Sequence, residues 1–188
     1  MKTIYIFIIF IVVGLVQLFI PVNMILNQEA ILKSGTVYKF KTRPVDPNDP
    51  FKGKYINLNY QIDTFETLDT LWQRYDEVYV YLTVDSLGFA KIKNISRDVI
   101  LNSKNDYIKA KVYWYSKVDH KLSMSFPFNR YYMEESKAEN AEKVVRDIQR
   151  KSTPSATYAL VYIKNGQGVL NDVILEGMPI NNYLEKHK

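Results

Sequence analysis

The first hydrophobic block of the chain is long and uncharged. Residues 3–28 contain no charged side chain. Within them, residues 4–26 are apolar except at Gly14, Gln17, Pro21 and Asn23. A helix of this length crosses a hydrocarbon core of about 30 Å. The pattern therefore predicts a transmembrane helix that continues to Ser34 and ends before Gly35, a residue type favoured after helix ends.

A cleaved signal peptide is the alternative for this block. Such a peptide has a shorter apolar region, followed by a cleavage site of small residues. Residues 20–26 read Ile-Pro-Val-Asn-Met-Ile-Leu and offer no pair of small residues. We therefore expect an uncleaved signal anchor over residues 1–28 and a separate α+β domain over residues 29–188.

The rest of the chain alternates between apolar and polar positions with the period of two that is typical of strands. Strands are expected at residues 36–42, 55–62, 77–84, 89–95, 107–115, 122–126, 157–164 and 169–176. In the second strand, the inward positions are Ile56, Leu58, Tyr60 and Ile62, and the outward ones are Tyr55, Asn57, Asn59 and Gln61. The same alternation places Val84 and Trp114 on buried faces of their strands.

Two helices are expected in this domain. Residues 130–151 carry an apolar stripe at helical spacing, formed by Ala138, Ala141, Val145 and Ile148. A short helix is also expected around residues 68–75. The predicted fold class is α+β: an N-terminal transmembrane helix, then an antiparallel β-sheet or partly closed β-barrel with one packed α-helix.

Composition excludes several classes of function. The chain has no cysteine, which excludes a lipoprotein anchor, a zinc–thiolate site and a cysteine nucleophile. The net charge is only +5 and basic residues are mixed with acidic ones, so nucleic acid is not an expected partner. His120 and His187 stand alone, and no Ser–Lys or Ser–His arrangement is recognisable. We expect no metal and no cofactor.

A proline-rich loop precedes the second predicted strand. Pro44, Pro47 and Pro50 each remove a backbone donor and favour extended geometry before them, which predicts a rigid loop. Asp46 and Asp49 in this loop either cap turns or supply oxygen ligands for calcium. Gly53 is expected to supply an unusual backbone angle at the entry to the strand.

Basic side chains gather after the apolar block. They are Lys33, Lys39, Lys41, Arg43, Lys52 and Lys54. They contact anionic lipid headgroups in one interpretation and are solvated loop charges in the other. Because only Lys2 precedes the block, the distribution of positive charge does not fix its orientation. The strand-rich composition favours a body outside the cytoplasm.

Residues 33–60 resemble the GDYXXLXY family of bacterial membrane-anchored proteins. The motif stands here as Gly53-Lys54-Tyr55-Ile56-Asn57-Leu58-Asn59-Tyr60, with Lys54 in place of the aspartate. The segment before it, Arg43-Pro44-Val45-Asp46-Pro47-Asn48-Asp49-Pro50, is also family-like, as is Arg130-Tyr131-Tyr132-Met133-Glu134-Glu135. The resemblance implies a single anchor in the bacterial inner membrane, a periplasmic or other extracytoplasmic body, and genomic association with multi-spanning membrane proteins. It implies no activity.

Two functions remain open at this point. The first is a non-enzymatic binding or assembly module that acts with an integral membrane partner. Its predicted binding residues are Asp46, Asp49, Gly53, Tyr55, Asn57, Arg130 and Tyr132. The alternative is a cell-envelope enzyme that acts on a glycan or peptide, with Glu134 or Glu135 as general acid or base. The dipole of the predicted helix explains these two glutamates equally well.

Overall fold

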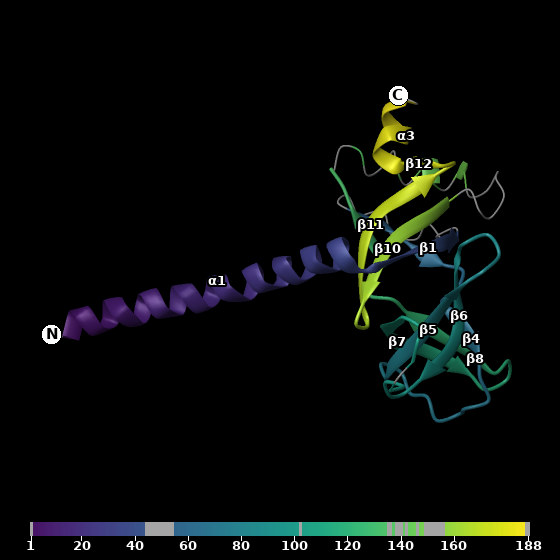
Figure 1. The fold of residues 1–188 in the computed structure, drawn as a ribbon, viewed down its shortest axis with the longest axis horizontal. Coiled ribbons are helices and arrows are strands. Elements are labelled where there is room, and N and C mark those ends of the chain that lie inside the picture. Colours follow the sequence, from purple (N-terminus) through teal and green to yellow (C-terminus); the bar gives the residue numbers. More distant parts are fainter. Residues whose placement is uncertain are drawn as a thin grey trace.

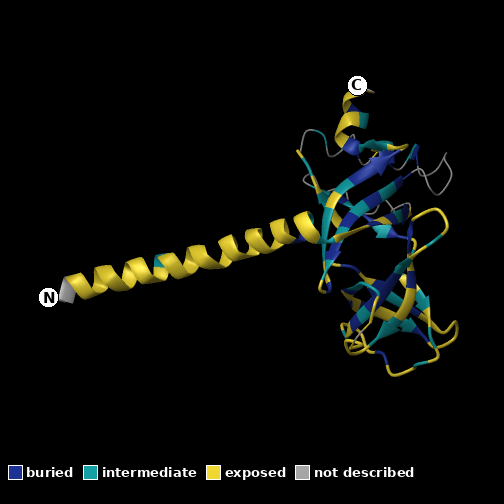
Figure 2. Ribbon diagram, in the orientation of Figure 1, coloured by how far each residue is buried: buried dark blue, intermediate teal, exposed yellow. Residues whose placement is uncertain are grey.

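The computed structural model describes residues 2–43, 55–101, 103–134 and 157–186, together with residues 137, 141, 143–145, 147 and 148. The N-terminal helix α1 (Lys2–Ser34) projects from the body as a single rod (Figure 1). Its 33 residues rise about 50 Å at about 1.5 Å per residue. Its apolar side chains are exposed along most of its length (Figure 2).

Residues Ile4–Ser34 of α1 are long and apolar enough to cross a membrane, either as an anchor or as a signal sequence. The helix ends where predicted, directly before Gly35. Gly35 does not adopt the left-handed conformation. A glycine suits this position because other backbone atoms approach it closely. A Cβ atom on Gly35 would lie 2.6 Å from the carbonyl oxygen of Ile31 and 3.1 Å from that of Ile163.

The described strands of the body form two five-stranded sheets and a two-stranded ladder. The first sheet has the order β12 (Met178–Pro179), β11 (Gln167–Leu175), β10 (Thr157–Lys164), β1 (Thr36–Arg43), β3 (Asn59–Tyr60). The second has the order β4 (Thr64–Glu66), β8 (Lys121–Ser125), β7 (Tyr107–Ser116), β5 (Glu77–Val84), β6 (Ala90–Ser96). The ladder pairs β2 (Tyr55–Asn57) with β9 (Arg130–Tyr132), and a short helix, α3 (Ile180–Lys186), lies near the C-terminus.

Neighbouring strands in both sheets are antiparallel. Two isolated parallel bridges, Lys39 with Phe89 and Ile108 with Gly166, connect the first sheet region to the second. The result is a nearly closed, barrel-like arrangement of strands, preceded in the chain by the apolar helix α1. The predicted fold class is therefore confirmed.

One hydrophobic core joins the two sheets. At its centre, the ring of Phe40 on β1 lies 5.4 Å from that of Tyr60 on β3 and 5.0 Å from that of Phe128, measured between centroids. The ring of Phe126, just after β8, stacks 5.4 Å from that of Phe128. These aromatic contacts connect strands from both sheets, so the body folds around a shared core.

The predicted helix at residues 130–151 is correct in its middle and wrong at its start. Every described residue between 137 and 148 is helical, and Ala141, Val145 and Ile148 are buried in the core. Arg130–Tyr132 instead form strand β9, because their backbone pairs with β2.

The predicted strand at residues 55–62 is divided between two partners. Its first part, β2, pairs with β9, and its second part, β3, pairs with β1. Leu58 lies between the two strands and donates its backbone N–H to the carbonyl of Asn129 at 2.8 Å. The predicted alternation is confirmed as far as Tyr60, since Ile56, Leu58 and Tyr60 are buried. Ile62, the fourth predicted inward position, is half-buried and lies in a turn beyond β3.

The short helix predicted around residues 68–75 is wrong. Residues 67–73, all described by the structure, have no regular secondary structure. The side chain of Asp69 accepts the backbone N–H of Leu71, and that of Asp76 accepts the backbone N–H of Gln73, each at 2.9 Å. Such local bonds compete with helix formation.

Val84 and Trp114 are 55% and 58% exposed, so their predicted burial is wrong. Val84 is the last residue of β5, where the alternation is otherwise kept: Val80 and Leu82 are buried, and the extra residue of the β5–β6 pair, Lys93, lies on β6. On β7 the register shifts between Val112 and Trp114, so Tyr113 is an extra residue in that strand. A β-bulge adds one residue to a strand, which reverses the alternation beyond it. Helix α3 was not anticipated from the sequence.

Candidate functional site

Strands β2 and β9 bring four of the predicted binding residues together. In their antiparallel register, Tyr55 lies opposite Tyr132 and Asn57 lies opposite Arg130. Residues directly opposite each other, and residues two apart on one strand, share a face of a sheet. We call the surface formed by Tyr55, Asn57, Arg130 and Tyr132 the ladder face.

The side chains of the ladder face contact one another. The rings of Tyr55 and Tyr132 lie 5.4 Å apart between centroids, at an interplanar angle of 56°. The guanidinium of Arg130 lies over the Tyr55 ring, 4.9 Å from its centre. The hydrogen bond between Arg130 and Tyr132 is the main cause of a raised pKa of Arg130. This surface is a cationic and aromatic cluster, with Tyr132 65% exposed.

The opposite side of the ladder is fixed to the body. Ile56 is buried, and the hydroxyl of Tyr131 donates to the Asp172 carboxylate on β11 at 3.1 Å. Burial, followed by the charge of Asp172, raises the pKa of Tyr131 to about 12. A buried side and an exposed side of the same ladder are what the period of two predicts.

Glu134 lies just beyond the ladder but is not enclosed. Its side chain is 71% exposed, and its Oε2 atom lies 3.6 Å from Nζ of Lys137. Lys137 also lies 3.6 Å from Oε1 of Glu185 on α3. Asp46, Asp49, Gly53 and Glu135 lie outside the described residues, so the structure does not place them.

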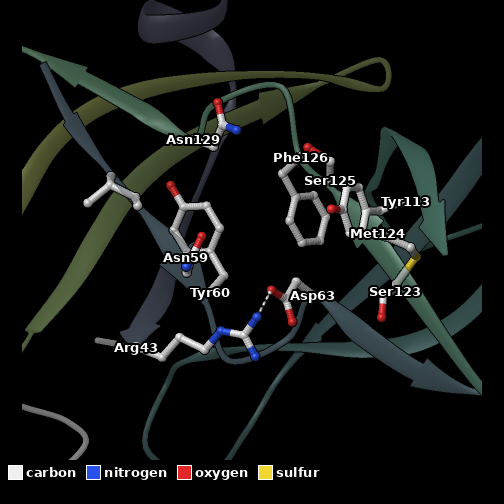
Figure 3. Close-up of a pocket in the computed structure, with 11 residues that line it drawn as sticks. Arg43, Asn59, Tyr60, Asp63, Tyr113, Ser123, Met124, Ser125, Phe126 and Asn129 are labelled. Carbon is white, nitrogen blue, oxygen red and sulfur yellow. Dashed lines mark hydrogen bonds and ion pairs between the residues drawn. The ribbon is translucent and has the colours of Figure 1, made fainter. Parts of the chain in front are cut away.

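Sequence reasoning did not find a pocket beside the ladder, which we call the Arg43 pocket. It has a volume of about 410 Å³, within the usual range for ligand sites. Its lining residues are Arg43, Leu58, Asn59, Tyr60, Asp63, Tyr113, Ser123, Met124, Ser125, Phe126 and Asn129 (Figure 3). The pocket adjoins the ladder face along the chain, since Asn59 and Asn129 are close neighbours of Asn57 and Arg130.

An ion pair forms one wall of the Arg43 pocket (Figure 3). Nη2 of Arg43 lies 2.6 Å from Oδ2 of Asp63. Burial raises the pKa of Asp63, although the charge of Arg43 opposes the shift. Oδ1 of Asp63 is buried and has no hydrogen-bond partner within the described part of the chain. Arg43 therefore fixes Asp63 in the pocket wall through Oδ2, whereas no described residue pairs with Oδ1.

A second pocket, the Tyr75 pocket, adjoins the first. It also has a volume of about 410 Å³. Its lining residues are Tyr75, Glu77, Lys109, Ala110, Lys111, Val112, Tyr113, Ser125, Phe126, Pro127 and Asn129. Four residues, Tyr113, Ser125, Phe126 and Asn129, line both pockets. The two pockets therefore meet at Tyr113.

No sequence signal marks these pockets. Tyr113 occupies the β7 bulge, and a bulge leaves no mark in an alternating pattern. Arg43 and Asp63 form their ion pair only because the chain turns back after β3. Only the two outward asparagines of the predicted strand, Asn57 and Asn59, indicated a polar surface in this region.

Among the described residues, no group of three or more His, Asp or Glu side chains is placed to hold a metal ion. Comparison with curated proteins and with solved structures gave no match. A family model described as GDYXXLXY protein matches residues 17–173, which include the second half of α1, the ladder, the second sheet and the first sheet as far as Val173 in β11. The chain therefore belongs to the GDYXXLXY family.

Proposed function

We propose that this protein is a membrane-anchored module that binds an integral membrane partner through its ladder face. One observation carries the proposal: two distant segments form one surface, in which half-buried Tyr55 on β2 lies beside exposed Arg130 and Tyr132 on β9. The family membership and the apolar helix α1 are consistent with a membrane-anchored protein.

The chemistry of the ladder face suits protein recognition. Tyrosine and arginine are over-represented among residues that dominate binding energy at protein interfaces. Here the Arg130 guanidinium is already stacked on Tyr55, and the ladder is fixed from below by Tyr131 and Ile56. A surface that is ordered before binding loses little conformational entropy when a partner arrives.

The connection between α1 and the body favours a partner in the same membrane. Only Gly35 separates the end of α1 from the start of β1. Ile31 on the last turns of α1 is buried, and Nζ of Lys164 donates to Oγ of Ser34 at 2.7 Å. With α1 as an anchor over residues 1–28, this short connection keeps the body near the bilayer surface.

We place the body on the extracytoplasmic side of a bacterial inner membrane. The strand-rich body and the resemblance of its motif to membrane-anchored proteins support this side. Because the chain has no cysteine, a single Val118→Cys substitution creates a unique label site in an exposed turn. In intact spheroplasts, a membrane-impermeant maleimide should label it fully, and labelling only after lysis would contradict the proposed orientation.

The enzyme alternative has no supporting observation in the described residues. Glu134 is open to solvent and paired with Lys137, whereas a general acid or base works in an enclosed site beside its substrate. We therefore keep binding as the proposed function.

A photo-crosslinking experiment tests the partner. A benzoylphenylalanine residue is introduced at Tyr132 in the full chain, in intact cells, and adducts are analysed after detergent extraction. The matched control carries the same residue at Leu87, which is equally exposed but lies in the β5–β6 turn. We expect a discrete adduct with a multi-spanning protein from position 132 only. Adducts of equal yield from both positions, or none from 132, would overturn the proposal.

A further inference from the structure

We propose that the Arg43 pocket and the Tyr75 pocket together form a binding groove for a linear oligosaccharide that carries an acidic group. The proposal is independent of the ladder face and of its membrane partner. It rests on three features of the groove: its unusual backbone, the chemistry of its lining, and its charge.

Two backbone irregularities lie next to each other in the groove. Tyr75 has a φ of 74°, which is uncommon for a residue with a side chain, and Tyr113 occupies the β7 bulge. The backbone N–H of Tyr75 donates to the carbonyl of Val112 at 2.8 Å, so the two irregularities are joined. Strained backbone and bulges recur at binding sites, where they direct side chains toward a ligand.

The two tyrosines at this point are exposed and held in place. Tyr75 is 66% exposed and Tyr113 is 60% exposed. The guanidinium of Arg74 lies over both rings, 4.9 Å from the centre of Tyr75 and 5.4 Å from that of Tyr113. An ordered aromatic ring offers an electron-rich face to the C–H groups of a sugar ring.

The polar part of the groove matches sugar hydroxyl groups. Asn59, Asn129, Ser123 and Ser125 line the Arg43 pocket (Figure 3). Amide and hydroxyl side chains both donate and accept hydrogen bonds, as sugar hydroxyls do. Two adjoining pockets of equal volume, both lined by Tyr113, suit a ligand made of repeated units.

Charge in the Tyr75 pocket favours an acidic group on the ligand. Lys109 and Lys111 line this pocket, and Arg74 lies beside it on the Tyr75 ring. Glu77, which lies opposite Lys111 in the register of β5 and β7, offsets one of the three positive charges. In the Arg43 pocket, Asp63 already neutralises Arg43. The excess of positive charge therefore lies at the Tyr75 end.

A peptide fits this groove less well than a glycan. Peptides commonly bind a sheet by adding a strand to an exposed edge. Strands β7 and β8, which supply much of the lining, are internal strands of their sheet and already pair on both sides. Recognition in the groove must therefore use side chains, which favours a ligand with many hydroxyl groups.

The test measures binding to the full-length protein in detergent by isothermal titration. The probes are a tetramer of galacturonic acid, the uncharged tetramer of N-acetylglucosamine and an acidic glutamate-rich peptide. We expect the acidic tetrasaccharide to bind at least tenfold more tightly than the other two probes. Lack of binding to the acidic tetrasaccharide, or stronger binding of the peptide, would overturn the proposal.

Matched variants locate the binding. Tyr113→Ala should weaken binding of the acidic tetrasaccharide at least tenfold, whereas Tyr113→Phe, which keeps the ring, should change it less than twofold. Trp114→Ala removes a neighbouring exposed aromatic residue that is outside the described lining of both pockets, and it should leave binding unchanged. Equal losses in Tyr113→Ala and Trp114→Ala, or an unaffected Tyr113→Ala protein with normal thermal unfolding, would overturn the assignment.

Discussion

The hydroxyl of Tyr60 donates to the backbone carbonyl of Phe128 at 2.7 Å, inside the core that joins the two sheets. Tyr60 is the last residue of the family motif and is only 2% exposed. Leu58, three positions after Tyr55 in the same motif, is also buried. In the described part of the motif, Leu58 and Tyr60 thus belong to the core, and Tyr55 belongs to the ladder face.

Replacing Tyr60 with Phe should destabilise the fold by about 1–2 kcal/mol, because a buried carbonyl loses its hydroxyl donor. The ring remains, so the aromatic contacts with Phe40 are kept. Chemical unfolding of the full-length protein in detergent measures the change. Tyr75→Phe, at an exposed ring, is the control and should stay within about 0.5 kcal/mol of the wild type. Equal unfolding midpoints for both variants would contradict this role of Tyr60.

The sequence alone predicted the ladder face but not its pairing. The alternation from Tyr55 to Tyr60 correctly separated the buried side chains from the half-buried ones on the outer face, because burial of one face follows directly from the period of two. It could not reveal that the backbone changes partners at Leu58, since both halves keep the same alternation. The same limit applies to Arg130: the sequence pattern places it in a helix, but its backbone pairs with β2 as part of β9.

Exposed Trp114 illustrates a second limit. A bulge depends on how two strands pair, and the sequence of one strand does not record it. The pockets that meet at Tyr113 depend on such a bulge, so they could not be predicted. In contrast, α1 was predicted almost completely, because a long apolar run needs no partner strand to define it.

Replacing Gly35 with Ala should loosen the junction between α1 and the body. The added Cβ would lie 2.6 Å from the carbonyl oxygen of Ile31 and 3.1 Å from that of Ile163. Both are backbone atoms, so neither can make room unless α1 or β10 shifts. Overpacking of this kind costs about 1–3 kcal/mol. Thermal unfolding in detergent measures the loss.

The control for this prediction is Gly14→Ala, in the middle of α1. No described atom lies within 4 Å of a Cβ at this position, apart from the neighbours and backbone of its own helix. Its unfolding temperature should therefore match that of the wild type. If Gly35→Ala were equally harmless, the close approach of Ile163 to the helix end would not limit this position.

Arg43 should stabilise the fold mainly at neutral pH. Burial raises the pKa of Asp63 and Arg43 lowers it, so the ionised form of Asp63 depends on its partner. Arg43→Ala should therefore cost about 1–2 kcal/mol at pH 7, where Asp63 is charged in the unfolded chain. The cost should shrink as the pH falls below about 4, because Asp63 then becomes protonated in both states.

Asp63→Asn gives the complementary result. A carboxyl whose pKa is raised on folding is most favourable below its unfolded pKa, and this advantage is lost as the pH rises through the folded pKa. The neutral amide avoids that loss, so Asp63→Asn should be at least as stable as the wild type at pH 7. Unfolding curves at pH 3.5 and pH 7 check both variants, and a large loss for Asp63→Asn at pH 7 would contradict the direction of the pKa shift.

Tyr131 should make the fold sensitive to alkaline pH. Burial, followed by the charge of Asp172, raises the pKa of Tyr131 from 10.0 to about 12, and burial with Asp106 does the same for Tyr38. Between about pH 10 and pH 12 the unfolded chain has lost protons that the folded chain keeps, so stability falls as the pH rises. Tyr131→Phe should reduce this fall by the equivalent of one proton, while Tyr75→Phe should leave it unchanged. Chemical unfolding at pH 9, 10.5 and 11.5 measures the slope, and identical slopes in all three proteins would contradict a pKa of Tyr131 that is raised on folding.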